Sequence, residues 1–158
     1  MPSTKESTEK LGLLNDPYHK LSERVKSYFE YGFVDRWIDG DTFEATVDLG
    51  FRISIVERFR LFNYNAPECK GHTSNMGKKA LQHVKSLIPE GYKVLLQTYK
   101  DDVFGRWLAD VYYGEDFSDS LVDVLISEGW GVHWDGKGKS PEPWYSWPEY
   151  PMVTVKTG

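Results

Sequence analysis

The feature that most constrains the fold is a change in the period of the apolar residues along the chain. Apolar and polar residues alternate over 33–62, and the segments 92–99 and 107–113 indicate two more strands. Between and after these segments, apolar residues recur at helical spacing over 74–88 and 121–128. The pattern predicts three strands, a helix, two strands and a second helix.

The ends of these elements carry turn and cap residues. A turn at 48–50 leads into a long third strand, which we expect from Phe51 to Phe62. Ile53 and Ile55 continue the alternation of that strand. The first helix has a start signal at Ser74 or Asn75 and a stop signal at Pro89 and Gly91. The second helix has a cap at Ser118 or Asp119 and a stop at Gly129.

The number of strands predicts the architecture. Short strands leave sheet edges exposed unless the sheet curls and closes on itself. We therefore predict a five-stranded OB-fold barrel with helices, a mainly β fold of the α+β kind. The length of 158 residues suits one such domain with an extension at each end. We expect an N-terminal extension over 1–28 with an amphipathic helix at 17–28, the barrel over 29–133, and a proline- and tryptophan-rich tail over 134–158 that packs on the barrel.

Charge and cysteine content exclude some classes of protein. A net charge of −5 argues against tight, sequence-independent binding along a duplex, which needs many contacts from Lys and Arg to phosphates. Cys69 is the only cysteine, so no disulfide framework forms, and its spacing from His83 and His133 does not indicate zinc. With no apolar run that could cross a membrane and no secretory signal at its start, we expect a cytoplasmic protein without a membrane partner.

Three polar segments carry residues suited to phosphodiester chemistry, at 38–43, 59–68 and 101–109. The first is a turn rich in carboxylates, the second is the end of a strand with its following loop, and the third opens the fifth strand. Hydrolysis of a phosphodiester needs a water nucleophile, a group that orients or deprotonates it, and positive charge around the phosphoryl oxygens.

Arginine and oxygen-bearing side chains in these segments match those needs. Arg60 and Arg106 can each donate paired hydrogen bonds to a phosphate and keep their charge. Asp41, Asn65 and Glu68 supply oxygens that suit a hard cation such as Ca²⁺ or the activation of water. Each segment alone is more typical of a turn or a solvated surface. Their occurrence together, in this order, favours a metal-dependent phosphodiesterase.

The same segments resemble the signature of the staphylococcal-nuclease-like (thermonuclease) family. The matching stretches are Asp-Gly-Asp-Thr at 39–42, Arg-Leu-x₄-Ala-Pro-Glu at 60–68 and Asp-x-x-Gly-Arg-x-Leu-Ala at 102–109, followed by a helix and glycine turn at 121–131. The resemblance covers roughly residues 33–133, and its set of motifs is specific. It implies an OB-fold barrel and a Ca²⁺-dependent endonuclease that hydrolyses DNA and RNA with little sequence preference.

The resemblance also implies a metal site. Asp41 matches a direct metal ligand, Asn65 falls where the family usually has a second aspartate, and Ala66 falls where the family uses a main-chain oxygen. Since an amide carries no charge, we expect weaker Ca²⁺ binding, and another divalent metal is an alternative. The residues implied to support the site without touching the metal are Asp39, Thr42 and Asp102.

The implied catalytic residues are Arg60, Glu68 and Arg106. The two arginines match those that bind the phosphate, the second near the leaving oxygen, and Glu68 matches the carboxylate that positions or activates water. Val103 and Phe104 depart from the family, because they replace the lysine and tyrosine that grip a terminal phosphate. The final helix of the family has no counterpart in the proline-rich tail.

Nucleic acid, DNA and/or RNA, is the expected partner. Lys70, Lys78 and Lys79 form a basic cluster that either approaches a nucleic-acid backbone or is simply solvated, and both readings stay open. Trp130 and Trp134 could stack on bases, but we expect them in the core and at the rim of the barrel, because tryptophan gains most from burial.

Two other functions stay open. Asn65, the acidic balance and the altered tail also suit a catalytically weakened module that binds nucleic acid, or a protein partner through the aromatic tail. An inhibitor that mimics nucleic acid has less support, because the charges are spread along the chain. The change Asn65→Asp separates the nuclease from the binding module. A weak enzyme would bind Ca²⁺ more tightly and cut faster, whereas a binding module would gain nothing.

Overall fold

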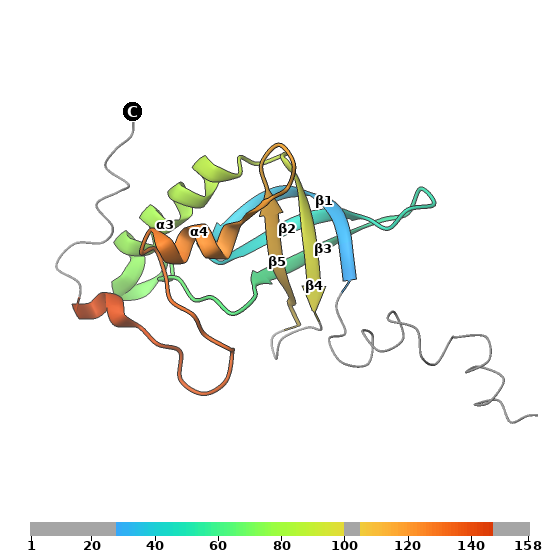
Figure 1. Ribbon diagram of the computed structural model, residues 1–158. Helices are drawn as coiled ribbons and strands as arrows, with labels where there is room; N and C mark the ends of the chain where they lie inside the picture. The colour runs from blue at the N-terminus through green and yellow to red at the C-terminus, as the bar shows by residue number, and fades with distance from the viewer. Residues whose placement is uncertain (1–27, 100–104, 147–158) are drawn as a thin grey trace, which may run out of the picture.

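The structure is a computed structural model that describes residues 28–99 and 105–146 (Figure 1). In chain order, its elements are β1 (Tyr28–Asp39), β2 (Thr42–Asp48), β3 (Ser54–Leu61), the 3₁₀ turn η1 (Gly71–Thr73), α3 (Ser74–Leu87), β4 (Lys93–Tyr99), β5 (Trp107–Tyr113), β6 (Asp119–Ser120), α4 (Leu121–Ser127) and the 3₁₀ turn η2 (Pro143–Ser146). None of the helices in the described ranges has the length and apolar character that a membrane span requires.

The strands close into a barrel. Antiparallel pairing joins them in the order β3-β2-β1-β4-β5, and the parallel pairing of β3 with β5 completes the circle. The prediction of a five-stranded OB-fold barrel with helices is confirmed. Helix α3 contacts β1, helix α4 contacts β5, and His83 of α3 lies 3.0 Å from Glu128 just after α4. Closure leaves few unpaired edges, which is the physical reason that short strands adopt this arrangement.

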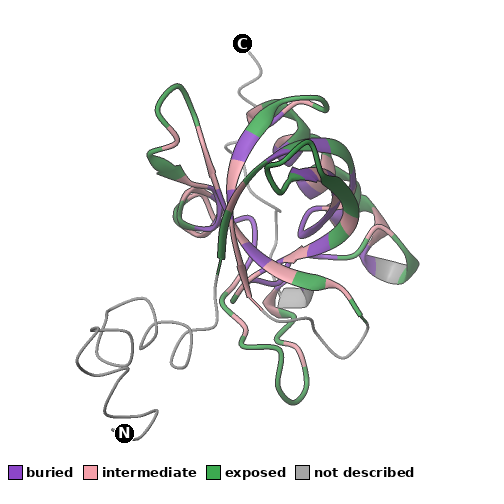
Figure 2. Cartoon of the chain, turned by 90° about the vertical axis from the view of Figure 1, so that its right-hand side faces the viewer, coloured by how far each residue is buried: buried purple, intermediate pink, exposed green. Residues whose placement is uncertain are grey.

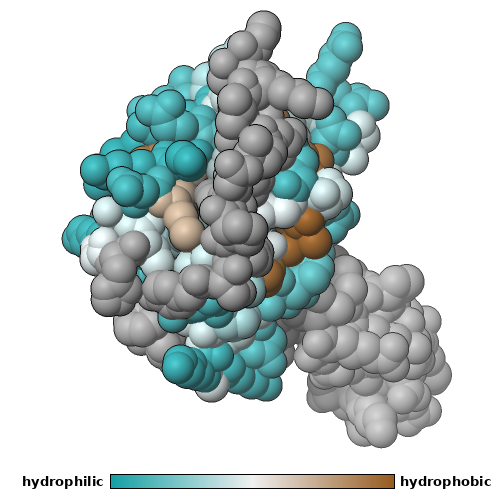
Figure 3. All heavy atoms as spheres, turned by 90° about the vertical axis from the view of Figure 1, so that its left-hand side faces the viewer, coloured by the Kyte–Doolittle hydropathy of each residue, from teal (hydrophilic) through white to brown (hydrophobic). Residues whose placement is uncertain are grey.

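One apolar core lies inside the barrel and under the helices, and Figure 2 marks the buried stretches of the strands and helices in purple. The largest fully buried side chains are those of Trp130, Trp144, Tyr64, Phe43, Leu61, Ile88, Leu96, Leu121 and Leu125. The indole of Trp37 donates to the carbonyl of Ile88 at 2.9 Å, which ties β1 to the end of α3. The face of the molecule on the side of the helices is mostly hydrophilic where the described residues are visible (Figure 3), as amphipathic helices require.

The helix boundaries follow the sequence signals with one correction. Helix α3 begins at Ser74, as predicted, and Gly129 has a φ of 80° just after α4, which suits a helix stop. Ser120 caps α4, rather than Ser118 or Asp119, and its hydroxyl accepts from the amide of Asp123 at 3.4 Å. The prediction was wrong because Asp119 and Ser120 first pair with β5 as the short strand β6.

The first and third strands also differ from the prediction. Tyr28 begins β1 instead of ending a helix, and the rest of that predicted helix lies outside the described residues. Strand β3 begins at Ser54, because Gly50, Phe51 and Arg52 form a turn with φ values of 76°, 52° and 64°. This end of the hairpin extends beyond the barrel (Figure 1), and Phe51 is 95% exposed. The expected division into extension, barrel and tail remains a prediction.

Candidate active site

The turn between β1 and β2 brings the first polar segment next to β3. Thr42 pairs with Arg60 in the β2–β3 register, and the amide of Leu61 donates to the carbonyl of Asp41 at 2.8 Å. Gly40 lets the turn approach α3, because a Cβ there would lie 2.8 Å from a side-chain carbon of that helix. The register and the turn therefore place the side chains of Asp41 and Arg60 side by side.

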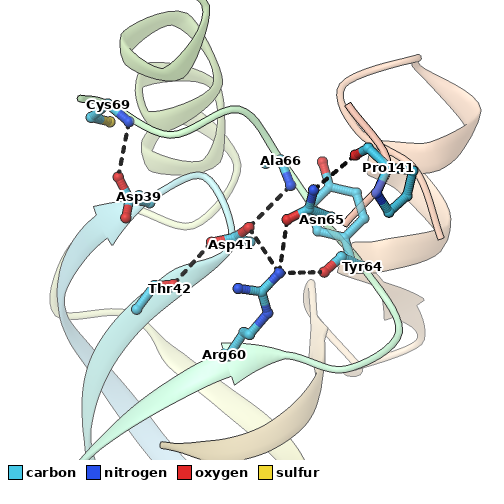
Figure 4. A network of polar contacts seen from close by, with 9 residues as sticks. All are labelled: Asp39, Asp41, Thr42, Arg60, Tyr64, Asn65, Ala66, Cys69 and Pro141. Carbon is cyan, nitrogen blue, oxygen red and sulfur yellow. Dashed lines mark hydrogen bonds and ion pairs between the residues drawn. The ribbon is translucent and has the colours of Figure 1, made fainter. Parts of the chain in front are cut away.

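The carboxylate of Asp41 is buried and has a partner on each oxygen. Its Oδ1 accepts from the hydroxyl of Thr42 at 2.9 Å, and its Oδ2 accepts from the amide of Ala66 at 3.0 Å. The Nη2 atom of Arg60 lies 3.6 Å from the same Oδ2. Because a buried carboxylate needs such partners, Asp41 is held where the turn, β3 and the loop after β3 meet (Figure 4).

Arg60 is a nearly buried cation, with 14% of its side chain exposed. Its Nη2 donates to Oδ1 of Asn65 at 2.8 Å and to the carbonyl of Tyr64 at 3.3 Å. The indole ring of Trp134 covers the guanidinium at 5.0 Å, within the range of a cation–π contact. Within the described residues, the hydrogen bonds and ion pair of Arg60 all use Nη2. Nη1 and Nε are therefore the donors that could serve an anionic ligand.

Asn65 joins the loop after β3 to the C-terminal segment. Its side chain is buried, and Nδ2 donates to the carbonyl of Pro141 at 3.1 Å. Its backbone amide donates to the carbonyl of Val132 at 2.8 Å, and its backbone carbonyl accepts from the amide of Val132 at 3.0 Å. Gly131 permits this approach, because a Cβ there would lie 2.4 Å from the carbonyl oxygen of Asn65.

Sequence reasoning missed the contribution of the C-terminal segment to this site. Trp130 is in the core, as predicted, whereas the half-buried Trp134 lies against Arg60. Pro141 takes part through its backbone carbonyl, which every residue possesses, so its side-chain type carries no signal. Gly131 is the one position with a usable signal, because a glycine beside a buried tryptophan indicates a close backbone approach.

Glu68 lies on the same loop as Asn65 and Ala66, with its side chain exposed. Its backbone carbonyl accepts from the hydroxyl of Thr73 at 2.8 Å. The same oxygen packs on α3 at Gly77, where a Cβ would lie 2.1 Å away from it. The loop is therefore anchored on α3 while the carboxylate stays at the surface, and Glu68 is not part of the network in Figure 4.

Of the expected supporting residues in the described ranges, Thr42 donates to Asp41, whereas Asp39 bonds elsewhere. Asp39 accepts from the amide of Cys69 at 3.2 Å, and Asp102 lies outside the described residues. Burial, then a hydrogen bond to Asp39 and the negative charges of Asp39 and Asp41, raise the pKa of the Cys69 thiol to about 12, while Lys78 opposes the rise. This raised pKa favours the protonated thiol at neutral pH.

Arg106 directly precedes β5 and is half-buried. In the parallel pairing of β3 with β5, Trp107 faces Phe59 and Leu108 faces Arg60. Arg60 on β3 and Arg106 just before β5 therefore belong to neighbouring segments of the barrel. The β3–β5 register that brings the segments of the two arginines side by side forms only when the barrel closes.

The basic cluster lies outside the polar network. Lys70 directly precedes η1, and Lys78 and Lys79 lie on α3. All three side chains are exposed. Because η1 and α3 carry the groups that anchor Glu68, the lysines occupy the surface adjoining that loop.

The donor set limits which metal the site could hold. Among the described residues, no three His, Cys, Asp or Glu side chains gather as a metal site. Oδ2 of Asp41 and Oδ1 of Asn65 lie 3.6 Å and 2.8 Å from Nη2 of Arg60, so both oxygens already face a positive charge. Carboxylate and amide oxygens are the donors that hard cations take. These residues fit such a cation, with less negative charge than two carboxylates would provide.

Comparison with known proteins places these residues in a family. The model of the family described as staphylococcal nuclease homologue matches residues 58–138, just over half of the chain. The matched region contains Arg60, Asn65, Glu68 and Arg106, and it continues past Trp134. A search of curated proteins found no matching relative. On the strength of the family model, this chain belongs to the staphylococcal nuclease homologue family.

Proposed function

We propose that this chain is a metal-dependent nuclease that hydrolyses phosphodiester bonds of DNA and/or RNA with little sequence preference. The observation that carries the proposal is the convergence of Asp41, Arg60 and Asn65 in one polar network. Membership of the staphylococcal nuclease homologue family supports it. An arginine held this firmly, with Nη1 and Nε available, is suited to a phosphate.

In the proposed reaction, Arg60 and Arg106 bind the phosphoryl oxygens. Nη1 and Nε of Arg60 can each donate a hydrogen bond to a phosphoryl oxygen. Arg106, next to the strand of Arg60, stabilises the charge that develops on the phosphoryl group and the leaving oxygen. Glu68, exposed on an anchored loop, orients the attacking water or accepts its proton.

Asp41, Asn65 and the main-chain oxygen of Ala66 would hold Ca²⁺ in this proposal. A bound divalent cation supplies Lewis acidity at the phosphoryl oxygen. Because Asn65 adds no charge, we expect lower affinity than in a site with two aspartates, and another divalent metal is an alternative. The support for this assignment is that Oδ2 of Asp41 and Oδ1 of Asn65 lie within 3.6 Å and 2.8 Å of the same Arg60 atom, so the two oxygen donors are close together.

In this proposal, the exposed lysines bind the nucleic-acid strand beside the site. Lys70, Lys78 and Lys79 adjoin the loop that carries Glu68. Phosphates on either side of the scissile bond would meet these side chains as the strand crosses the site. Their contribution depends on salt, because exposed charge pairs are screened.

A second candidate function is a module that binds nucleic acid with weakened catalysis. The neutral Asn65, whose amide is engaged with Arg60 and Pro141, favours it over a fully active site. In that case the protein retains DNA or RNA without cutting it. Binding and cleavage measured on the same oligonucleotide therefore separate the two functions.

A nuclease assay across a metal series tests the proposal. Labelled single-stranded DNA and RNA are incubated with the protein in Ca²⁺, Mg²⁺ or Mn²⁺, and in EDTA. We expect cleavage with at least one divalent metal and none in EDTA. If every oligonucleotide stays intact with ample metal, the proposed activity is wrong. Retention of the intact strand on the protein would then support the binding module.

A further inference from the structure

The side chain of Asn65 connects two parts of the site at once. Its Oδ1 accepts from Arg60 at 2.8 Å, and its Nδ2 donates to the carbonyl of Pro141 at 3.1 Å. Figure 4 shows the amide between these two partners. Because Asn65 is buried, each contact satisfies a polar group that has little access to water.

Residues 134–141, which we call the strap, are held at both ends. Just before the strap, Val132 pairs with the backbone of Asn65 in both directions. Just after it, Trp144 is 1% exposed within the core. The strap therefore bridges two fixed points, and the bond from Asn65 to its last residue holds it against the loop after β3.

The strap covers one face of Arg60. Trp134 places its ring 5.0 Å from the guanidinium carbon, and its Nε1 donates to the carbonyl of Lys137 at 3.0 Å. The amide of Lys137 donates to Asp135 at 2.9 Å, which orders the turn that carries the indole. With one face against Trp134 and Nη2 already bonded, Nη1 and Nε are the atoms of Arg60 that can donate to a phosphate.

The two contacts of Asn65 need one acceptor and one donor on the same side chain, and an amide provides both. An aspartate keeps the acceptor for Arg60, but it has no donor for the carbonyl of Pro141 and would face that oxygen with a negative charge. A serine is too short to reach both partners. The residue that lowers the charge of the proposed metal site is therefore also the residue that holds the strap.

We propose that Asn65 is a positioning residue that ties the strap across Arg60 and so fixes the direction from which the guanidinium meets a phosphate. The catalytic consequence rests on the proposed nuclease function, whereas the hold on the strap does not. When the strap is released, Arg60 loses its fixed neighbour Trp134 and its side chain gains rotational freedom. Ordering it again on binding weakens the interaction with substrate.

Limited proteolysis tests the hold on the strap without any assay of activity. Lys137 and Lys139 are exposed trypsin sites within the strap. In Asn65→Asp, we expect cleavage after these lysines to be about tenfold faster, the effect of one lost hydrogen bond on local opening. Asn63→Asp adds the same charge at an exposed position two residues away and serves as the matched control. Mass spectrometry assigns each cut to its lysine.

A second variant protects this test against misfolding. Asn65→Ser removes the bond to Pro141 without adding charge, and circular dichroism shows which variant keeps the fold. If either folded variant is cut after Lys137 and Lys139 no faster than Asn63→Asp, the strap is not held by Asn65 and the proposal is wrong. If both variants at Asn65 unfold, the residue holds the whole fold rather than the strap, and the proposal is also wrong.

Kinetics separate positioning from a purely structural role. With saturating Ca²⁺, Asn65→Asp should raise the KM for a single-stranded oligonucleotide roughly fivefold relative to Asn63→Asp, without lowering kcat. A lower kcat at unchanged KM would contradict the positioning role. An inactive wild-type protein would contradict the proposed nuclease function, and proteolysis would still decide whether Asn65 holds the strap.

Discussion

The two ends of the β2–β3 hairpin share one alternating pattern and have opposite surroundings. At the barrel end, the pair of Thr42 and Arg60 adjoins the network around Asp41. At the far end, Phe51 is 95% exposed and Ile53 is 55% exposed. Strand β5 pairs with β3 only at residues 59–61, so closure of the barrel covers one end of the hairpin alone. Alternating apolar and polar side chains identify a strand, but its apolar side chains are buried only where another part of the molecule packs on them.

The two ends also differ in what holds their backbone. The site end is fixed by side-chain hydrogen bonds and by close packing on α3, as at Gly77. The far end depends on a turn in which Phe51 and Arg52 have φ values of 52° and 64°. That region is unfavourable for residues other than glycine, asparagine and aspartate. Several contacts therefore fix the backbone at the site end, whereas the turn at the far end carries backbone strain.

The largest effect that separates the site, including the neighbouring Arg106, from the far end of the hairpin is on turnover. Arg106→Ala should lower the turnover number about 100- to 1,000-fold, because the charge on the leaving oxygen loses its stabilising cation. The measurement is the initial rate on labelled single-stranded DNA at saturating substrate and Ca²⁺. Arg52→Ala, which makes the same change at the exposed far end, should leave the rate within about twofold. Equal losses in both variants would show that the site end has no special role.

A methyl group at the anchor of the site loop should have the next largest effect. Gly77→Ala places a Cβ 2.1 Å from the carbonyl oxygen of Glu68, so the loop must move off α3. We expect the free energy of unfolding to fall by about 2 kcal/mol, measured by urea denaturation. Gln82→Ala, exposed on the same helix, should change it by less than about 0.5 kcal/mol. A stable Gly77→Ala protein would mean that the loop is not tightly seated.

A change of charge at the site should alter metal binding. Asn65→Asp adds a second carboxylate to the proposed metal site, and we expect Ca²⁺ affinity to rise about tenfold because affinity grows with ligand charge. Isothermal titration calorimetry measures the dissociation constant. Asn63→Asp, at an exposed position on the same loop, should not alter it beyond about twofold. Equal affinities in the two variants would remove Asn65 from the metal site.

The smallest expected effect is relief of strain at the far end. Replacing Phe51 and Arg52 by Asn and Gly supplies the residues that a two-residue hairpin turn with positive φ prefers. We expect the free energy of unfolding to rise by about 1 kcal/mol, with turnover unchanged. Urea denaturation and the nuclease assay measure the two outcomes. A loss of turnover would contradict the separation of the two ends.

The sequence by itself determined the order of the elements and the identity of the polar segments. The alternation around Phe43 and the helical stripe through Ala80 predicted strands and helices that the structure contains. Cap and stop residues placed most boundaries within a few positions, because capping and glycine act over one turn of the chain. The three motif segments were sufficient to predict the family, which the family model confirms.

Only the tertiary structure decided which groups meet. The bond from Asn65 to Pro141 spans 76 positions and ends on a backbone carbonyl, which has the same chemistry at every residue. The place of Trp134 over Arg60 and the exposure of Phe51 depend on which layers cover each strand. Local propensity acts over a few residues, whereas these contacts arise when the barrel closes and the C-terminal segment returns to it.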